Sequence, residues 1–143
     1  MVGPVIVAPD SVDPATPPWS WTAVGDLIRL RNQSGTWLLM LPSLWSLVLA
    51  NGGRPPWSLT VVFAMGAFVM RSLGVVFNDL ADRNFDKHVA RTSGRPLAAG
   101  RLAPRQALLV ALVLTIVAAL LVATLNTFTM LLSPIALFLA AVY

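Results

Sequence analysis

The sequence contains no cysteine and only one histidine, His88, and it carries little charge. Without cysteine the chain has no disulfide framework, no thiolate metal site and no cysteine nucleophile. A zinc site of the usual kind is excluded as well, because it needs several cysteine or histidine ligands. Charged residues make up 11% of the chain, against roughly 25% in soluble proteins. Since 57% of the residues are hydrophobic, the composition indicates an integral membrane protein.

Three further patterns are missing. The net charge is +4, yet no tract rich in lysine or arginine is present, so we expect no nucleic-acid partner. A GxGxxG fingerprint for a dinucleotide is absent too. The amino terminus lacks the basic segment of a signal peptide. We expect the proline-rich residues 1–20 to be a disordered cytoplasmic terminus. Residues 21–143 are expected to form the amino-terminal part of a truncated membrane domain, with no known protein partner.

What the sequence does contain is a series of four apolar stretches. Residues 57–77 are long enough to span a bilayer, which takes about 20 residues. Residues 37–50 reach that length if their helix extends back towards Leu27, and Pro42 within them is tolerable in a helix bundle. Residues 107–125 and 128–143 are the other two stretches. The sequence therefore predicts an all-α fold, a polytopic transmembrane bundle with about four helices here.

The basic residues predict how this bundle is oriented. Six of them lie between the second and third apolar stretches, whereas the neighbouring loops hold one or none: Arg83, Lys87, Arg91, Arg95, Arg101 and Arg105. Basic residues accumulate on the cytoplasmic side of a membrane. We therefore expect the 78–105 loop and both chain termini to be cytoplasmic.

Three aspartates and an asparagine follow the second apolar stretch. If its helix continues, Asn78, Asp82 and Asp86 recur every four residues and share one face, with Asp79 on the flank. Carboxylates crowded on one face repel each other unless a cation compensates their charge. Oxygen ligands of this kind suit Mg²⁺. We expect all four residues to be metal ligands and the three aspartates to be catalytic. The alternative is a solvated helix end held by salt bridges, although ionisable groups at a membrane bundle tend to be functional.

Arginines follow the acidic residues at short spacing. Arg91 and Arg95 lie in the run Arg-Thr-Ser-Gly-Arg-Pro-Leu, and a planar guanidinium binds phosphate through two hydrogen bonds. Acids, Mg²⁺ and arginines together describe a diphosphate clamp, so we expect Asn78, Arg91 and Arg95 to bind a diphosphate. Arg101 and Arg105 are interpreted as topology signals.

These residues together resemble the UbiA superfamily of intramembrane aromatic prenyltransferases. The chain fills every position of that family's NDxxDxxxD motif, and the run after it is similar to the VxRTxxRPL(x)xG pattern of 4-hydroxybenzoate polyprenyltransferases: Val89, Arg91, Thr92, Arg95, Pro96, Leu97 and Gly100. Upstream, Arg71 and Gly74 match the RxxGxxxND prefix, and residues 29–45 resemble the first-helix pattern. The resemblance covers roughly residues 27–143.

The resemblance implies a membrane fold of about nine helices and a reaction of quinone biosynthesis. A polyprenyl group would pass from a polyprenyl diphosphate to the ring of 4-hydroxybenzoate, with Mg²⁺, at a site facing the cytoplasm of a bacterial inner membrane. We expect Arg71 to bind the acid's carboxylate and Gly74 to leave room for its ring. The family's second aspartate-rich motif has no counterpart in these 143 residues, so we expect the piece alone to be inactive.

Three alternatives stay open at this point. One is a truncated, non-catalytic membrane protein. Another is prenylation of a different aromatic acceptor. The third is a small ion transporter, since intramembrane acids can line ion paths; such a transporter would place its acids at mid-span, whereas here they follow the apolar stretch. The partners expected on the favoured interpretation are a polyprenyl diphosphate, an aromatic acid and membrane lipid.

Overall fold

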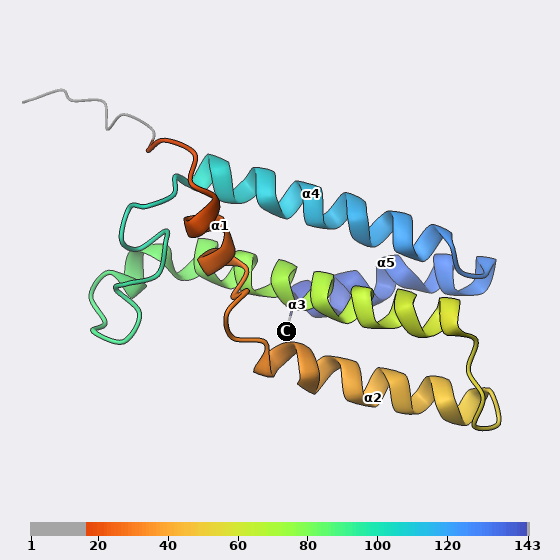
Figure 1. Cartoon of the computed structure of the whole chain (residues 1–143). Helices are drawn as coiled ribbons and strands as arrows, with labels where there is room; N and C mark the ends of the chain where they lie inside the picture. The colour runs from red at the N-terminus through yellow and green to blue at the C-terminus, as the bar shows by residue number, and fades with distance from the viewer. Residues whose placement is uncertain (1–16, 143) are drawn as a thin grey trace, which may run out of the picture.

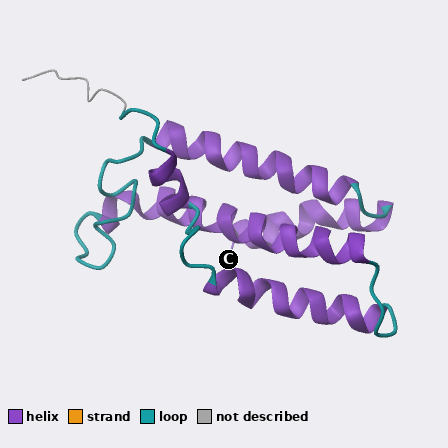
Figure 2. Ribbon diagram, in the orientation of Figure 1, coloured by secondary structure: helices purple, strands orange, loops and turns teal. Residues whose placement is uncertain are grey.

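The computed structural model describes residues 17–142, and every regular element in that range is an α-helix (Figure 1, Figure 2). Helix α3 lies between α2 and α4, and α5 packs against α4, while the short α1 lies across one end of the bundle. This confirms the predicted all-α bundle. The helices are α1 (Trp21–Leu27), α2 (Ser34–Ala50), α3 (Trp57–Asp86), α4 (Pro104–Ala123) and α5 (Thr127–Val142).

The lengths of the helices bear on how they meet a membrane. Within the described residues, α3 and α4 are long and apolar enough to cross one, while α2 and residues 127–139 are shorter apolar helices. The 30 residues of α3 would extend about 45 Å at 1.5 Å per residue, whereas the hydrocarbon core is about 30 Å thick. For a helix that lies along the bilayer normal, about ten residues of α3 lie beyond the hydrocarbon, and fewer do so if the helix is tilted. The polar end, Asn78 to Asp86, is the part with the composition to do so.

The last two predicted helices are confirmed within a few residues. Helix α4 begins three residues earlier than expected because Pro104 occupies its first turn, where the missing N–H of proline costs nothing. At the start of α5, the Asn126 side chain accepts a hydrogen bond from the N–H of Thr129 at 2.8 Å. This is the standard way to satisfy a free amide at a helix start. Residue 143 lies outside the described residues.

The predicted extension of the first long helix back to Leu27 is wrong. The chain forms two helices there, α1 ending at Leu27 and α2 beginning at Ser34. Arg29 between them has φ +57°, a left-handed conformation that a right-handed helix cannot contain. Leu27 is fully buried in a cluster with α3 and α4. The chain therefore breaks between residues 27 and 34, so that α1 is buried at the end of the bundle instead of continuing into α2 as one long helix.

The main hydrophobic core is concentrated at the end of the bundle where α1 lies. It joins α1, α3, α4 and the 87–103 loop: Ala23, Leu27, Leu73, Val76, Leu97, Leu102, Ala107, Val110 and Ala111. Two of these residues, Leu97 and Leu102, anchor the loop, at 5% and 1% exposure. Their burial fixes the loop on top of the helices, so polar side chains from the loop can take defined positions over the end of α3.

The predicted disordered segment, residues 1–20, falls largely outside the described range, which begins at residue 17. The carbonyl of Pro17 accepts a hydrogen bond from Gln106 Nε2 at 2.8 Å. Ser20 caps α1 by accepting a bond from the N–H of Ala23. Residues 17–20 therefore join the chain to α1 and α4, and disorder before them stays a prediction.

Candidate active site

Arg95 is held over the end of α3 by a single helical turn in the loop. Pro96 opens the turn, and its carbonyl accepts the N–H of Arg101 at 2.8 Å. Gly100 closes the turn with φ +68°, the left-handed position that glycine takes most easily. Leu97 is buried in the core. Leu97 is two residues after Arg95, so its burial fixes the backbone of the loop close to Arg95.

Two aspartates of α3 face Arg95. The Oδ1 atom of Asp79 lies 3.2 Å from Arg95 Nη1, and the Oδ2 atom of Asp86 lies 2.7 Å from the same nitrogen. The aspartates are seven residues apart, two helical turns, which places them on one side of α3. Both are buried, at 2% and 6% exposure. Buried charges are stable only when paired. Arg95 pairs with both acids, but its single positive charge offsets only one of the two negative charges.

A second cation reaches Asp79 from the turn between α1 and α2. Arg29 Nη2 lies 3.4 Å from Asp79 Oδ1, and the Arg29 carbonyl accepts a hydrogen bond from Gln33 Nε2 at 3.1 Å. The left-handed backbone of Arg29 costs of order 1–3 kcal/mol in a non-glycine residue. Arg29 was not identified as a site residue from the sequence. Its place in the run that resembles a first-helix pattern was the one signal that could have marked it.

Around these pairs lies a polar cavity of about 290 Å³, which we call the acid cavity. Five of the predicted site residues line this cavity: Arg71, Asn78, Asp79, Asp82 and Arg95. The other four lining residues are Arg29, Asn32, Ser34 and Val75. Asn78 and Asp82 are exposed, while Asp79 Oδ2 is buried and has no hydrogen-bond partner among the described residues. Two carboxylates, two amides and three guanidiniums therefore share one small space.

Three predicted site residues lie elsewhere. Asp86 is turned towards Arg95 and does not line the acid cavity. Gly74 is exposed and does not line the acid cavity, whereas the next residue, Val75, does. Arg91 lines a second cavity instead. The stripe that the sequence predicted on α3 is thus divided. Asp86 lies with Asp79, seven residues before it, on the side of α3 that faces Arg95.

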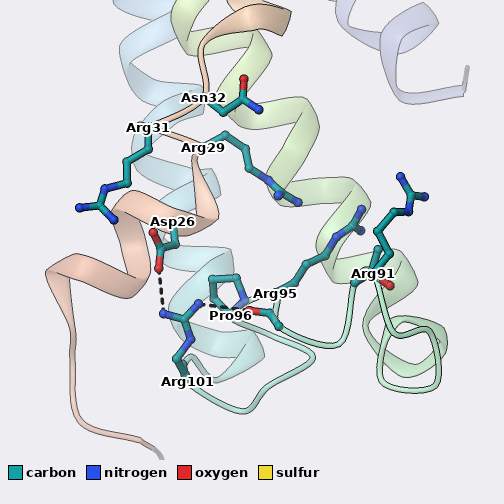
Figure 3. A pocket seen from close by; sticks show the side chains of 10 residues that line it. Asp26, Arg29, Arg31, Asn32, Arg91, Arg95, Pro96 and Arg101 are labelled. Atoms are coloured by element: carbon teal, nitrogen blue, oxygen red, sulfur yellow. Dashed lines mark hydrogen bonds and ion pairs between the residues drawn. The ribbon is translucent and has the colours of Figure 1, made fainter.

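The second cavity, the arginine cavity, has a volume of about 410 Å³ and lies between α1 and the loop (Figure 3). It shares Arg29, Asn32 and Arg95 with the acid cavity. Its full lining is Asp26, Arg29, Arg31, Asn32, Arg91, Thr92, Gly94, Arg95, Pro96 and Arg101. Arg101 pairs with Asp26 at 2.8 Å. Figure 3 shows Arg31 and Arg91 on opposite sides of the cavity, pointing away from each other. Its arginines therefore do not converge on one point.

A third cavity, of about 350 Å³, is apolar and follows the acid cavity along α3. Residues 62–70 of α3 contribute to it, and residues 71–82 contribute to the acid cavity. The change from apolar to polar lining falls between Met70 and Arg71. The full apolar lining is Leu39, Ser43, Val62, Phe63, Gly66, Ala67, Met70, Ala118, Leu121, Val122, Leu125 and Thr129.

Comparison with known proteins identifies the family. The sequence profile of the UbiA prenyltransferase family matches residues 39–143. The chain belongs to the UbiA prenyltransferase family. No solved structure matches it.

Relatives within the UbiA family are similar over most of this chain. A 4-hydroxybenzoate octaprenyltransferase of Janthinobacterium is 50% identical over 117 residues, which are 82% of this chain and 41% of that protein. Proteins of the same name from Tolumonas auensis and Thiobacillus denitrificans are 51% and 50% identical, over 88% and 82% of this chain. The chain spans about 40% of the length of these relatives.

UbiA prenyltransferases generally use Mg²⁺, and the acid cavity offers ligands that suit it. Among the described residues no group of three or more aspartate, glutamate, histidine or cysteine side chains is arranged to hold a metal. Mg²⁺ does not need so many, because it usually takes one or two carboxylates and completes its shell with phosphates and water. Asp79, Asp82 and Asn78 line one cavity, and the buried Asp79 Oδ2 lacks a partner in the described chain. The oxygens present therefore fit the ion.

The double pairing of Arg95 predicts a large effect on stability. In Arg95→Ala, Asp86 loses its cation and Asp79 keeps only Arg29, at 3.4 Å. Removing one partner from a buried pair typically costs about 3–5 kcal/mol. We expect a clear fall in the midpoint of thermal unfolding of the purified protein in detergent.

Arg101→Ala is the matched control. The Arg101–Asp26 pair has the same kind of geometry, but its side chains are 44% and 40% exposed. Exposed pairs contribute about 0–1 kcal/mol, so this variant is expected to unfold close to the unaltered protein. Equal midpoints for the two variants would show that burial does not distinguish these pairs.

Proposed function

We propose that the full-length protein transfers a polyprenyl group from a polyprenyl diphosphate to the ring of 4-hydroxybenzoate. The observation that carries the proposal is the acid cavity, where Asp79, Asp82 and Asn78 lie with three arginines beside an apolar cavity. Its relatives at about 50% identity carry the name of this activity. A polyprenyl diphosphate has a charged diphosphate and an apolar chain, which match the polar acid cavity and the apolar cavity that follows it along α3.

The arginines of the acid cavity act on the leaving group. As the bond between the allylic carbon and the diphosphate oxygen breaks, its electron pair stays on the diphosphate. Arg29 and Arg95 line the cavity and donate N–H groups, which bind phosphate oxygens strongly. Donors fixed in advance by the α1–α2 turn and the anchored loop stabilise this developing charge without having to reorganise.

Asp79, Asp82 and Asn78 would hold Mg²⁺, which when bound neutralises diphosphate charge. Asp79 is already oriented by its pairs with Arg29 and Arg95. Asp82 is exposed and forms no ion pair within residues 17–142. Its carboxylate is therefore available to bind a ligand in the acid cavity.

Arg71 receives the aromatic acid. It lies seven residues before Asn78, about 10 Å along the helix at 1.5 Å per residue, at the boundary with the apolar cavity. A guanidinium there binds the carboxylate and holds the ring beside the allylic carbon. The ring carbon ortho to the hydroxyl forms the new bond, and loss of its proton restores aromaticity. The apolar surroundings keep water away from the cation.

The proposal is tested with membranes that contain the full-length gene product. They are incubated with Mg²⁺, a polyprenyl diphosphate and labelled 4-hydroxybenzoate, and the label is expected to move into a prenylated product. Parallel reactions offer other aromatic acceptors. Transfer only to another acceptor would correct the substrate, and no transfer to any acceptor would overturn the proposed activity.

We also propose that the protein lies in a bacterial cytoplasmic membrane, with the α1 and loop end inside. The six basic residues of the 78–105 region support this orientation. Reporter fusions after residues 90 and 100 are expected to be active only as cytoplasmic reporters. Fusions in the turns at residues 51–56 and 124–126 are expected to report the opposite side. An external 78–105 region would reverse the orientation.

A further inference from the structure

We propose that Gly35 is a positioning residue for Arg71. Because Gly35 has no side chain, the guanidinium of Arg71 can lie across the first turn of α2 and reach into the acid cavity. The inference rests on the proposed function, in which Arg71 holds the aromatic acid.

The contact between the two residues is very close. A Cβ built on Gly35 would lie 2.8 Å from both Cζ and Nη2 of Arg71, and nearer still to Nε. Real Cβ atoms essentially never come within 3.0 Å of another heavy atom. The guanidinium therefore occupies the space that any side chain at position 35 would need.

The other described glycines show that this contact is unusual. A Cβ at Gly66 or Gly74 of α3 would meet no neighbouring atom within 4 Å, and one at Gly25 would make only an ordinary contact at 3.9 Å. Among the described glycines, Gly35 alone would bring a Cβ within 3.0 Å of a neighbour. The requirement for glycine at this position thus comes from Arg71.

The contact contributes little to the fold itself. Within residues 17–142, Arg71 makes no ion pair, and its charge lies beside the start of α2, the positive end of that helix dipole. Alanine would also be a better helix former than glycine at position 35. The arrangement therefore leaves the guanidinium available for an anion in the acid cavity.

Gly35→Ala should displace Arg71 without unfolding the protein. The atoms that the new Cβ would meet belong to the far end of a flexible side chain, so the guanidinium can move while the backbone of α2 stays in place. A displaced guanidinium no longer matches the carboxylate, and errors of about 1 Å in substrate positioning can cost roughly 100-fold.

The test uses the full-length protein and follows 4-hydroxybenzoate in two ways, by its KM in the transfer reaction and by its Kd without prenyl donor. In Gly35→Ala we expect both constants to rise roughly 10- to 100-fold, the loss that follows when a charged group loses its hydrogen bonds. The KM for polyprenyl diphosphate and the thermal midpoint should stay unchanged. Gly25→Ala is the matched control, expected to behave as the unaltered protein.

A double variant separates positioning from a general effect on α2. If Gly35 acts through Arg71, adding Gly35→Ala to Arg71→Ala changes nothing further. Additive losses, or an unaltered affinity in Gly35→Ala alone, would overturn the positioning role. Absence of prenyl transfer by the unaltered protein would contradict the proposed function instead.

Discussion

Replacing Asp82 with alanine is expected to lower the rate of prenyl transfer by about 10²–10³-fold, the usual cost of losing one group that stabilises developing charge. Asp82 lines the acid cavity, is exposed and forms no ion pair in the described chain. Its carboxylate therefore serves the ligand rather than the fold. The rate is measured in membranes with saturating substrates and Mg²⁺, after immunoblotting has shown equal insertion.

Asp82 is a better choice for this test than Asp79. Removing Asp79 would leave Arg29 and Arg95 without their shared carboxylate, so lost activity could follow from a disturbed fold. Asp26→Ala serves as the control, since this acid lies at the end of α1, outside the acid cavity, in an exposed pair. Near-normal turnover in Asp82→Ala would remove Asp82 from the diphosphate and metal site.

Replacing Arg71 with alanine is expected to raise the KM for 4-hydroxybenzoate roughly 10- to 100-fold. A hydrogen bond to a charged group contributes about 1.5–3 kcal/mol, and each 1.4 kcal/mol corresponds to about a factor of ten. Arg71 lines the acid cavity at its boundary with the apolar one, away from the acids at the end of α3. The KM for polyprenyl diphosphate should therefore change little.

Steady-state kinetics with each substrate varied in turn distinguish the two outcomes. Arg83→Ala is a suitable control because Arg83 lies on the same helix but lines neither polar cavity, and it bonds only to the nearby carbonyl of Leu80. If the KM for the diphosphate rises in Arg71→Ala while that for the acid does not, Arg71 belongs with Arg29 and Arg95 instead.

The helices and the acidic motif were predictable because both depend on local patterns. Apolar length predicted α3, α4 and α5 within a few residues, apart from the polar extension of α3. The four-residue spacing of Asn78 and Asp82 predicted one shared face of the helix, and both residues line the same cavity. Periodicity alone, however, could not show which acids are neutralised by the protein itself.

The pairing of these acids depends on contacts between distant segments. Arg29 is 50 residues from Asp79 in sequence, and it reaches the acid because α1 is buried and the chain turns through a left-handed residue. The contact of Gly35 with Arg71 likewise joins two helices. No local pattern encodes such geometry, so Arg29 and Gly35 were missed as site residues.

The positions of Arg29 and Arg95 on either side of Asp79 in the sequence matter while the chain is being made. Synthesis proceeds from the amino terminus at about 5–20 residues per second, so Arg29 has left the ribosome when Asp79 appears. Arg95 follows 16 residues later, within a few seconds at that rate. One of the two cations that pair with the buried carboxylate is thus already present in the chain when Asp79 is made, and the second follows soon after. The core that holds α1 in place needs residues 97–111 as well, so both pairs can form only once the loop and the start of α4 have been made.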